Sequence, residues 1–186
     1  KVYGPKGVGA LFVRRSPRLQ LAAELSGGGQ ERGLRSGTLP TPLCLGLGMA
    51  CKIAEREMEA EHQRIKVLRD RLYQHLTSEL DNISLNGDAE QRISGNLNVS
   101  VARIDGAALM MGIPEISVST GSACTSGALG PSYLLQALGL DAESSDTALR
   151  IGLGRFTTVD EVDYAAERIV TVVKQLRSQQ AQPTRA

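Results

Sequence analysis

Cys124 lies in a stretch, residues 118–127 (VSTGSACTSG). Apart from Val118 and Cys124 itself, all residues of this stretch are Gly, Ser, Thr or Ala. This composition cannot fill a packed core element and predicts an exposed, mobile loop. A thiol on such a loop is accessible, and its small neighbours leave it room to move, as a travelling nucleophile requires. The alternative is that Cys124 fills a core, because a free cysteine is among the residue types most often buried.

The sequence gives little indication of a second residue that could form a catalytic pair with the Cys124 thiol. His62 and His75 are the only histidines, and both fall at polar positions of one predicted helix, so we expect solvated side chains. A Cys/His catalytic arrangement is therefore weakly supported, and the activation of Cys124 has to come from elsewhere. Cys44 and Cys51 lie one heptad apart on an apolar segment, which favours a place in the core.

The bulk composition excludes several classes of function. The 186 residues include 21 Lys and Arg and 20 Asp and Glu, for a net charge of +1. This near-neutral balance implies no overall positive field that would attract a polyanion. With two Phe, four Tyr and no Trp, no stacking platform for nucleic acid is indicated either. Three cysteines without a C-x-x-C pair argue against a disulfide framework and a zinc site, and favour a reducing compartment.

No apolar run approaches the roughly twenty residues that cross a bilayer, and no signal peptide is recognisable, so we expect a soluble chain without membrane contact. The sequence begins with Lys1, directly in the turn-rich stretch KVYGPKGVG. We interpret it as a piece of a longer polypeptide.

Strands and helices alternate along the chain, which predicts an α/β fold. The first half contains a strand at residues 10–15 and a helix that begins at Thr41, with Pro42 at its first helical position. The first half of this helix is apolar nearly all round and is expected to be buried. Its continuation carries an amphipathic stripe: Ile65, Leu68, Leu72 and Leu76. A domain boundary is expected near Glu59, giving domains at residues 1–58 and 59–186.

The second half is predicted to contain short strands and helices. Strands are expected at residues 97–101 and 116–119 and from Leu149 onward, and a short helix at residues 106–111. A helix from Ser132 should end at Gly139. Thr158 and Glu161 have the Thr-x-x-Glu spacing of a capping box, which predicts the start of a last helix.

Four segments together, in this order, resemble one family: KVYGPKGVGAL, SGGGQERGLRSGT, STGSACTSG and LRIGLGRFT. They are similar to the cysteine desulfurases of the iron-sulfur cluster assembly type, which are class V aminotransferase family members with the type I fold of pyridoxal-phosphate enzymes. The resemblance covers nearly all of this chain and about the C-terminal half of a family member. It implies the end of the large cofactor-binding domain at residues 1–58 and the small C-terminal α+β domain, with the cysteine loop, at residues 59–186.

The resemblance also implies roles for single residues. Lys1 matches the lysine that holds pyridoxal 5'-phosphate as a Schiff base, with Lys6 as the competing candidate. Thr38 matches a threonine that reaches the cofactor phosphate of the other subunit of a homodimer. Arg150 matches the arginine that grips the carboxylate of the substrate, L-cysteine, and Arg155 is the alternative.

Cys124 matches the family's sulfur acceptor, which takes sulfur from L-cysteine as a persulfide and leaves L-alanine. No resident metal is implied, although Cys124 could transiently contact a cluster on an iron-sulfur scaffold protein. Arg14, Arg15 and Arg18 form a basic edge that in relatives receives acidic accessory proteins; alternatively they are solvated strand-end charges. The resemblance implies the cytoplasm of a bacterium, or alternatively the mitochondrial matrix.

Some features depart from the family pattern. The chain ends SQQAQPTRA, without the longer aromatic tail used in scaffold docking, and residues 105–108 read Asp-Gly-Ala-Ala where the family has a second acidic residue and a serine. Alone, the chain is expected to be inactive. The alternatives are a selenocysteine lyase, a desulfurase dedicated to another acceptor, and a non-catalytic regulatory or binding module that retains the fold.

Overall fold

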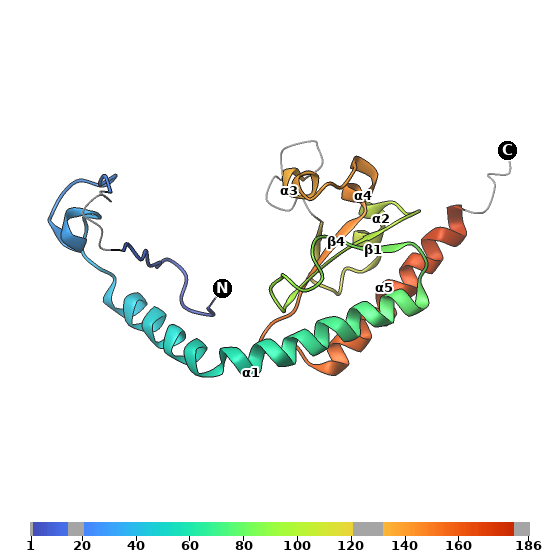
Figure 1. Ribbon diagram of the computed structural model, residues 1–186, viewed down its shortest axis with the longest axis horizontal. Helices are drawn as coiled ribbons and strands as arrows, with labels where there is room; N and C mark the ends of the chain where they lie inside the picture. Colours follow the sequence, from blue (N-terminus) through green and yellow to red (C-terminus); the bar gives the residue numbers. More distant parts are fainter. Residues whose placement is uncertain (1, 15–20, 121–131, 181–186) are drawn as a thin grey trace. The chain divides into compact units, whose positions relative to one another are not determined.

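The computed structural model describes residues 2–14, 21–120 and 132–180. The chain divides into two compact units, Lys1–Glu59 and Ala60–Ala186, which are described separately here. One long helix, α1 (Thr41–Glu79), contributes its first half to unit 1 and its second half to unit 2 (Figure 1).

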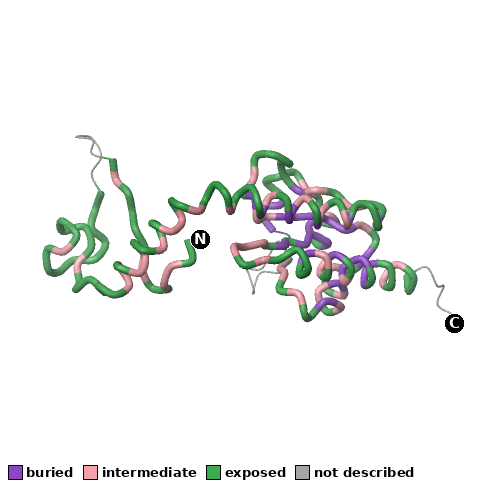
Figure 2. Tube along the Cα trace, turned by 90° about the horizontal axis from the view of Figure 1, so that it is seen from below, coloured by how far each residue is buried: buried purple, intermediate pink, exposed green. Residues whose placement is uncertain are grey.

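Unit 1 contains a short 3-10 helix, η1 (Gln30–Gly33), and the first half of α1. None of its described residues is buried, and Figure 2 shows no purple along this part of the chain. Leu11, Phe12 and Leu45 are more than 70% exposed, at 78%, 88% and 75%. The prediction that the first half of the helix is buried is therefore wrong for the described residues. An apolar helix face is buried only where another surface covers it, and the described residues of unit 1 cover this face in part, at Gly4 and Pro5.

Two further predictions in this unit are wrong for the same reason. Residues 10–14 form no strand, because no neighbouring strand pairs with them among the described residues. On α1, Cys51 is exposed and Cys44 is half-buried, so neither fills a core.

Unit 2 is built on an antiparallel sheet of four strands. They are β1 (Ile83–Leu85), β2 (Asn96–Val101), β3 (Ser119–Thr120) and β4 (Ala148–Gly152), in the spatial order β1-β2-β4-β3. The strands predicted near Leu97 and Leu149 are confirmed. The strand predicted at 116–119 is shorter and begins later, and β1 was not predicted.

The core lies between one face of this sheet and three helices: the second half of α1, α2 (Gly106–Gly112) and α5 (Val159–Gln180). The predicted stripe on α1 is confirmed, with Leu72 and Leu76 each 1% exposed. Two short helices, α3 (Tyr133–Ala137) and α4 (Ala142–Asp146), lie on the other side of the sheet (Figure 1). These two helices cover only part of the second face, because Arg150 of β4 stays exposed on it.

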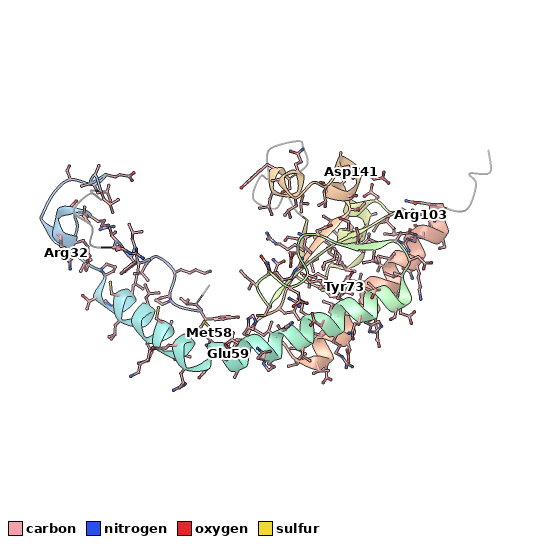
Figure 3. The ribbon with its side chains drawn as sticks, in the orientation of Figure 1. Arg32, Met58, Glu59, Tyr73, Arg103 and Asp141 are labelled. Carbon is pink, nitrogen blue, oxygen red and sulfur yellow. The ribbon has the colours of Figure 1, made fainter. Side chains whose placement is uncertain are left out.

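Side-chain caps fix where the helices of unit 2 begin. The predicted capping box is confirmed: the Thr158 amide donates to Glu161 at 2.8 Å, and the Glu161 amide donates to the Thr158 hydroxyl at 3.2 Å. Asp105 accepts from the Ala108 amide and so caps α2. Asp141, labelled in Figure 3, accepts from the Ser144 amide at 2.8 Å, which lowers the pKa of its carboxyl.

Candidate functional site

Arg150 lies in the middle of β4, on the face of the sheet that does not meet the core. Its neighbours Leu149 and Ile151 are buried, at 1% and 6% exposure, whereas Arg150 itself is exposed. Alternation of side chains along a strand accounts for this placement. Across the sheet, Arg150 pairs with Asn98 of β2 on one side and with Ser119 of β3 on the other.

The guanidinium of Arg150 makes no hydrogen bond or ion pair with any residue in the described ranges. A guanidinium presents five donors in a planar fork that fits a carboxylate. Arg150 is therefore a cation held on a rigid strand with its hydrogen-bonding capacity unused by the described part of the chain. That is the arrangement expected of a group that binds a carboxylate ligand.

Arg155, the alternative carboxylate-binding residue, is already engaged within the fold. Its Nε donates to Glu61 at 2.7 Å, and the two side chains are only 20% and 18% exposed. Arg64 holds the same turn by donating to the carbonyl oxygens of Thr157 and Arg155, at 2.8 Å and 2.6 Å. These contacts attach the turn between β4 and α5 to α1, so Arg155 has a structural part in positioning the strand that carries Arg150.

A buried polar network lies beside Arg150 on the same sheet. The Asn86 Nδ2 atom donates to Asn98 Oδ1 at 2.8 Å and to Ser100 Oγ at 2.9 Å. Ser100 Oγ in turn donates to the carbonyl oxygen of Ser144, on α4, at 2.6 Å. Sequence reasoning missed this network. The available signal was the repetition of polar residues at every second position of a strand whose other positions are apolar.

Thr38 ends a loop in unit 1 that is folded on itself. The Ser36 hydroxyl donates to the carbonyl oxygens of Leu25 and Ser26, at 3.0 Å and 2.8 Å, and Leu25 also forms a bridge with Arg35. Arg32, labelled in Figure 3, belongs to this loop. Its φ is 60°. Thr38 itself is exposed at the end of these contacts, with its hydroxyl unpaired among the described residues.

The residues just before Thr38 are closely packed. Gly37 has a φ of +108°, which favours glycine, and its amide donates to the Gln30 side chain at 3.1 Å. A Cβ added to Gly37 would lie 2.8 Å from Nη1 of Arg35, so this guanidinium packs closely over the glycine. The same Nη1 atom donates to the carbonyl oxygen of Ser36 at 2.8 Å, so Arg35 is held against the loop just before Thr38.

Several predicted residues cannot be placed. Lys1, Cys124, Arg15 and Arg18 lie outside the described residues. Arg14 is described and exposed, and Lys6 is exposed as well. Thr38 belongs to unit 1 and Arg150 to unit 2, so each is located only within its own unit.

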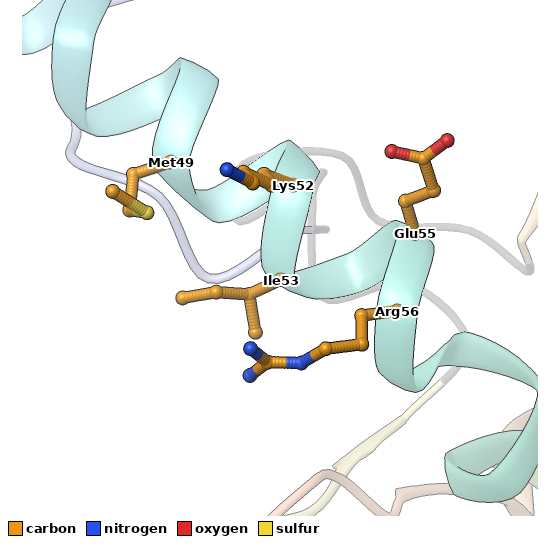
Figure 4. Close-up of a pocket in the computed structure, with 5 residues that line it drawn as sticks. All are labelled: Met49, Lys52, Ile53, Glu55 and Arg56. Carbon is orange, nitrogen blue, oxygen red and sulfur yellow. The ribbon is translucent and has the colours of Figure 1, made fainter.

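A hollow on the surface of unit 1 has no predicted site residue in its lining. It measures about 410 Å³ and is lined by Met49, Lys52, Ile53, Glu55 and Arg56 (Figure 4). All five come from one helix, α1, so the hollow is an open helix surface and not an enclosed ligand site. The described residues contain no cluster of metal-binding side chains and no helix long and apolar enough to cross a membrane.

The sequence and the fold place the chain in a known protein family. The sequence pattern of the family described as Aminotransferase class-V matches residues 1–165, and the chain belongs to this family. The fold resembles that of a solved NifS-like protein, with a TM-score of 0.80 and 31% identity, over 94% of this chain and 44% of that one. It also resembles DndA from Streptomyces lividans, with a TM-score of 0.65 and 36% identity, over 82% and 44%.

Curated relatives carry a more specific name. The chain is 51% identical over 177 residues to a cysteine desulfurase of Mus musculus, covering 95% of this chain and 39% of the relative. It is 52% identical over 177 residues to cysteine desulfurase IscS of Tolumonas auensis, covering 95% and 44%. The chain thus spans about two fifths of the length of these relatives.

Class V aminotransferases bind pyridoxal 5'-phosphate, a cofactor with a phosphate group. The exposed hydroxyl of Thr38 fits such a phosphate, because it can donate a hydrogen bond to a phosphate oxygen. The described residues are therefore compatible with the cofactor of the family.

Proposed function

We propose that this chain is the C-terminal part of a cysteine desulfurase, an enzyme that converts L-cysteine to L-alanine and retains the sulfur as a cysteine persulfide. The observation that carries the proposal is the unpaired guanidinium of Arg150, on the strand next to β3. Cys124 follows the end of β3 by four residues in the sequence. About half of the residues are shared with cysteine desulfurases, which supports the same assignment.

Arg150 binds the α-carboxylate of L-cysteine in this proposal. Its planar guanidinium can donate two parallel hydrogen bonds to the two carboxylate oxygens. This orients the substrate and balances its negative charge. The buried neighbours of Arg150 on β4 and the contacts of the following turn with α1 hold the strand, so little ordering is required on binding.

Thr38 donates to the cofactor phosphate, and Lys1 holds the cofactor and moves a proton at the α-carbon of the substrate. When bound, pyridoxal 5'-phosphate supplies an electron sink for the carbon from which that proton is removed. The loop contacts at Ser36 and Gly37 keep the Thr38 hydroxyl exposed for this purpose.

Cys124 is the sulfur acceptor. Its thiolate attacks the sulfur of the bound substrate, a sulfur-sulfur bond forms, and the carbon-sulfur bond of the substrate breaks. The balance is one L-cysteine and one enzyme thiol consumed, and one L-alanine and one enzyme persulfide formed. The attacking group must be the thiolate, since the thiol is the weaker nucleophile.

The complete enzyme is proposed to be a homodimer in which residues 1–58 belong to the large domain and 59–186 to the small one. The exposed apolar side chains of unit 1 support this view, because residues such as Leu11, Phe12 and Leu45 require a covering surface. The remaining part of the enzyme would supply it.

The acceptor of the persulfide is proposed to be an iron-sulfur scaffold protein, with other sulfur acceptors as alternatives. One solved relative is described as SspA in complex with cysteine, with a TM-score of 0.59 and 31% identity. A free thiol nucleophile persists in a reducing compartment, which favours the bacterial cytoplasm, with the mitochondrial matrix as the alternative. The exposed Arg14 remains a candidate contact for an acidic accessory protein.

The test is turnover by the full-length protein with its cofactor. With L-cysteine and a thiol reductant we expect L-alanine and sulfide in equal amounts, measured by amino-acid analysis and a colorimetric sulfide assay. Turnover confined to L-selenocysteine would instead identify a selenocysteine lyase. Absence of turnover with either amino acid, in protein that carries the cofactor, would identify a non-catalytic module.

Thr38→Val is expected to weaken the binding of pyridoxal 5'-phosphate by about tenfold, because valine keeps the shape of threonine but lacks the donor to the phosphate. The measurement is an absorbance titration of the apo protein with the cofactor. Thr41→Val is the matched control, since Thr41 is an exposed threonine three residues away at the start of α1. Equal dissociation constants for the two variants would contradict the role of Thr38.

A further inference from the structure

We propose that Asn98 is a second substrate-binding residue, whose side-chain amide donates a hydrogen bond to the α-carboxylate held by Arg150. The inference rests on the proposed function and adds to it a group that sets the preference for a carboxylate. It comes from the direction of the hydrogen bonds in the buried network of Asn86, Asn98, Ser100 and Ser144.

The serine in this network determines the direction. Ser100 has one hydroxyl proton and two possible acceptors, the Ser144 carbonyl oxygen at 2.6 Å and Asn86 Oδ1 at 3.2 Å. The shorter contact takes the proton. Ser100 Oγ is then free to accept, and it accepts from Asn86 Nδ2 at 2.9 Å. The amide of Asn86 is thereby oriented with its nitrogen toward β2.

The orientation of Asn86 in turn orients Asn98. The second proton of Asn86 Nδ2 is donated to Asn98 Oδ1 at 2.8 Å, so the carbonyl end of the Asn98 amide faces Asn86. Asn86 continues from β1, on one side of β2, and its backbone amide also donates to the carbonyl oxygen of Asn98, at 2.9 Å. Arg150 lies on β4, on the other side of β2. The Nδ2 atom of Asn98 is thus turned away from Asn86, on the side of Arg150.

This amide nitrogen is a donor without an acceptor. It makes no hydrogen bond with the residues that the structure describes, and Asn98 is only 8% exposed. The atom is not among the described side-chain atoms that are both fully buried and unpaired. Side chains of directly opposed residues in an antiparallel pair have Cβ atoms about 5 Å apart, so one carboxylate can contact both Asn98 and Arg150.

The two donors would do different things. The guanidinium of Arg150 supplies the charge, whereas the amide of Asn98 supplies a directed donor that is fixed before the substrate arrives. A site with such a donor binds a ligand more weakly when the ligand has no hydrogen-bond acceptor opposite the donor, because the donor is then left unpaired. Asn98 should therefore strengthen the preference for a carboxylate over a carboxamide.

The experiment uses the full-length protein with its cofactor and two competitive inhibitors that differ at one group, S-methyl-L-cysteine and its carboxamide. For Asn98→Ala we expect the inhibition constant of the acid to rise by about tenfold and that of the carboxamide to stay within about twofold. Asn98→Asp keeps the acceptor that Asn86 requires and is expected to weaken the acid further, by repulsion between carboxylates. The unchanged carboxamide constant shows that each variant is folded.

Two further variants separate the possible outcomes. Asn96→Ala is the matched control, because Asn96 is on the same strand and the same face but lies across from Gly152; it should leave both constants unchanged. Arg150→Ala should abolish the preference for the acid. If Arg150→Ala abolishes the preference for the acid over the carboxamide and both Asn98 variants retain that preference, the role of Asn98 is overturned while the proposed function stands. If Arg150→Ala also retains it, the carboxylate site itself is overturned.

Discussion

Cys124→Ser is expected to lower persulfide formation by at least about a thousandfold while leaving the absorbance of the bound cofactor unchanged. A serine hydroxyl is almost fully protonated at neutral pH and cannot form a sulfur-sulfur bond, so the transfer step has no acceptor. The measurement is a single turnover of the full-length protein with L-cysteine, followed by mass spectrometry of the protein. The wild type should gain the mass of one sulfur atom, and the variant should not.

The chain provides its own control for this substitution. Cys51 is an exposed cysteine on α1, so general reactivity of surface thiols would label it as well. Cys51→Ser should form the persulfide at the wild-type rate. If Cys124→Ser retained the added sulfur, or if Cys51→Ser lost it, the assignment of Cys124 as the sulfur acceptor would be wrong.

Arg150→Ala is expected to reduce kcat/KM for L-cysteine by about a hundredfold or more, since it removes a charged, two-pronged donor to the carboxylate. Arg150→Lys should recover only part of the loss, because an ammonium keeps the charge but cannot donate two parallel hydrogen bonds. Steady-state kinetics of alanine formation by the full-length protein measure both. The loss should appear mainly in KM if the carboxylate is held equally in the ground and transition states.

Arg155→Lys separates a substrate contact from a structural one. Arg155 is paired with Glu61 at 2.7 Å, so this variant should leave KM for L-cysteine close to that of the wild type. A larger rise in KM for Arg155→Lys than for Arg150→Lys would exchange the roles of the two arginines.

Features of the fold that depend on local sequence were predictable. The stripe from Ile65 to Leu76 is set by helical spacing, and the capping box at Thr158 is set by two residues three positions apart. The short elements β1 and α4 gave too few residues for a periodic signal. The burial of the first half of α1 was predicted wrongly, because whether an apolar face is covered depends on a partner surface that the helix sequence does not specify.

The candidate site divides in the same way. The strand that carries Arg150 could be predicted from its apolar alternation, and the role of the arginine was implied by the family resemblance. That Asn98 lies next to Arg150 could not be predicted. It depends on the register that pairs Asn98 with Arg150 and on a strand order in which β4 separates β2 from β3. Register is a property of two strands together and is absent from either one alone.

The absence of any buried described residue in unit 1 has a thermodynamic consequence. A segment without internal burial cannot offset the conformational entropy of its own ordering, so the free energy that orders it must come from a surface outside it. The stability of this segment then follows mass action: it rises with the occupancy of the covering surface and with the affinity for that surface. Folding of the described part of unit 1 and assembly of the enzyme would in that case be one equilibrium, whereas unit 2 carries a core of its own.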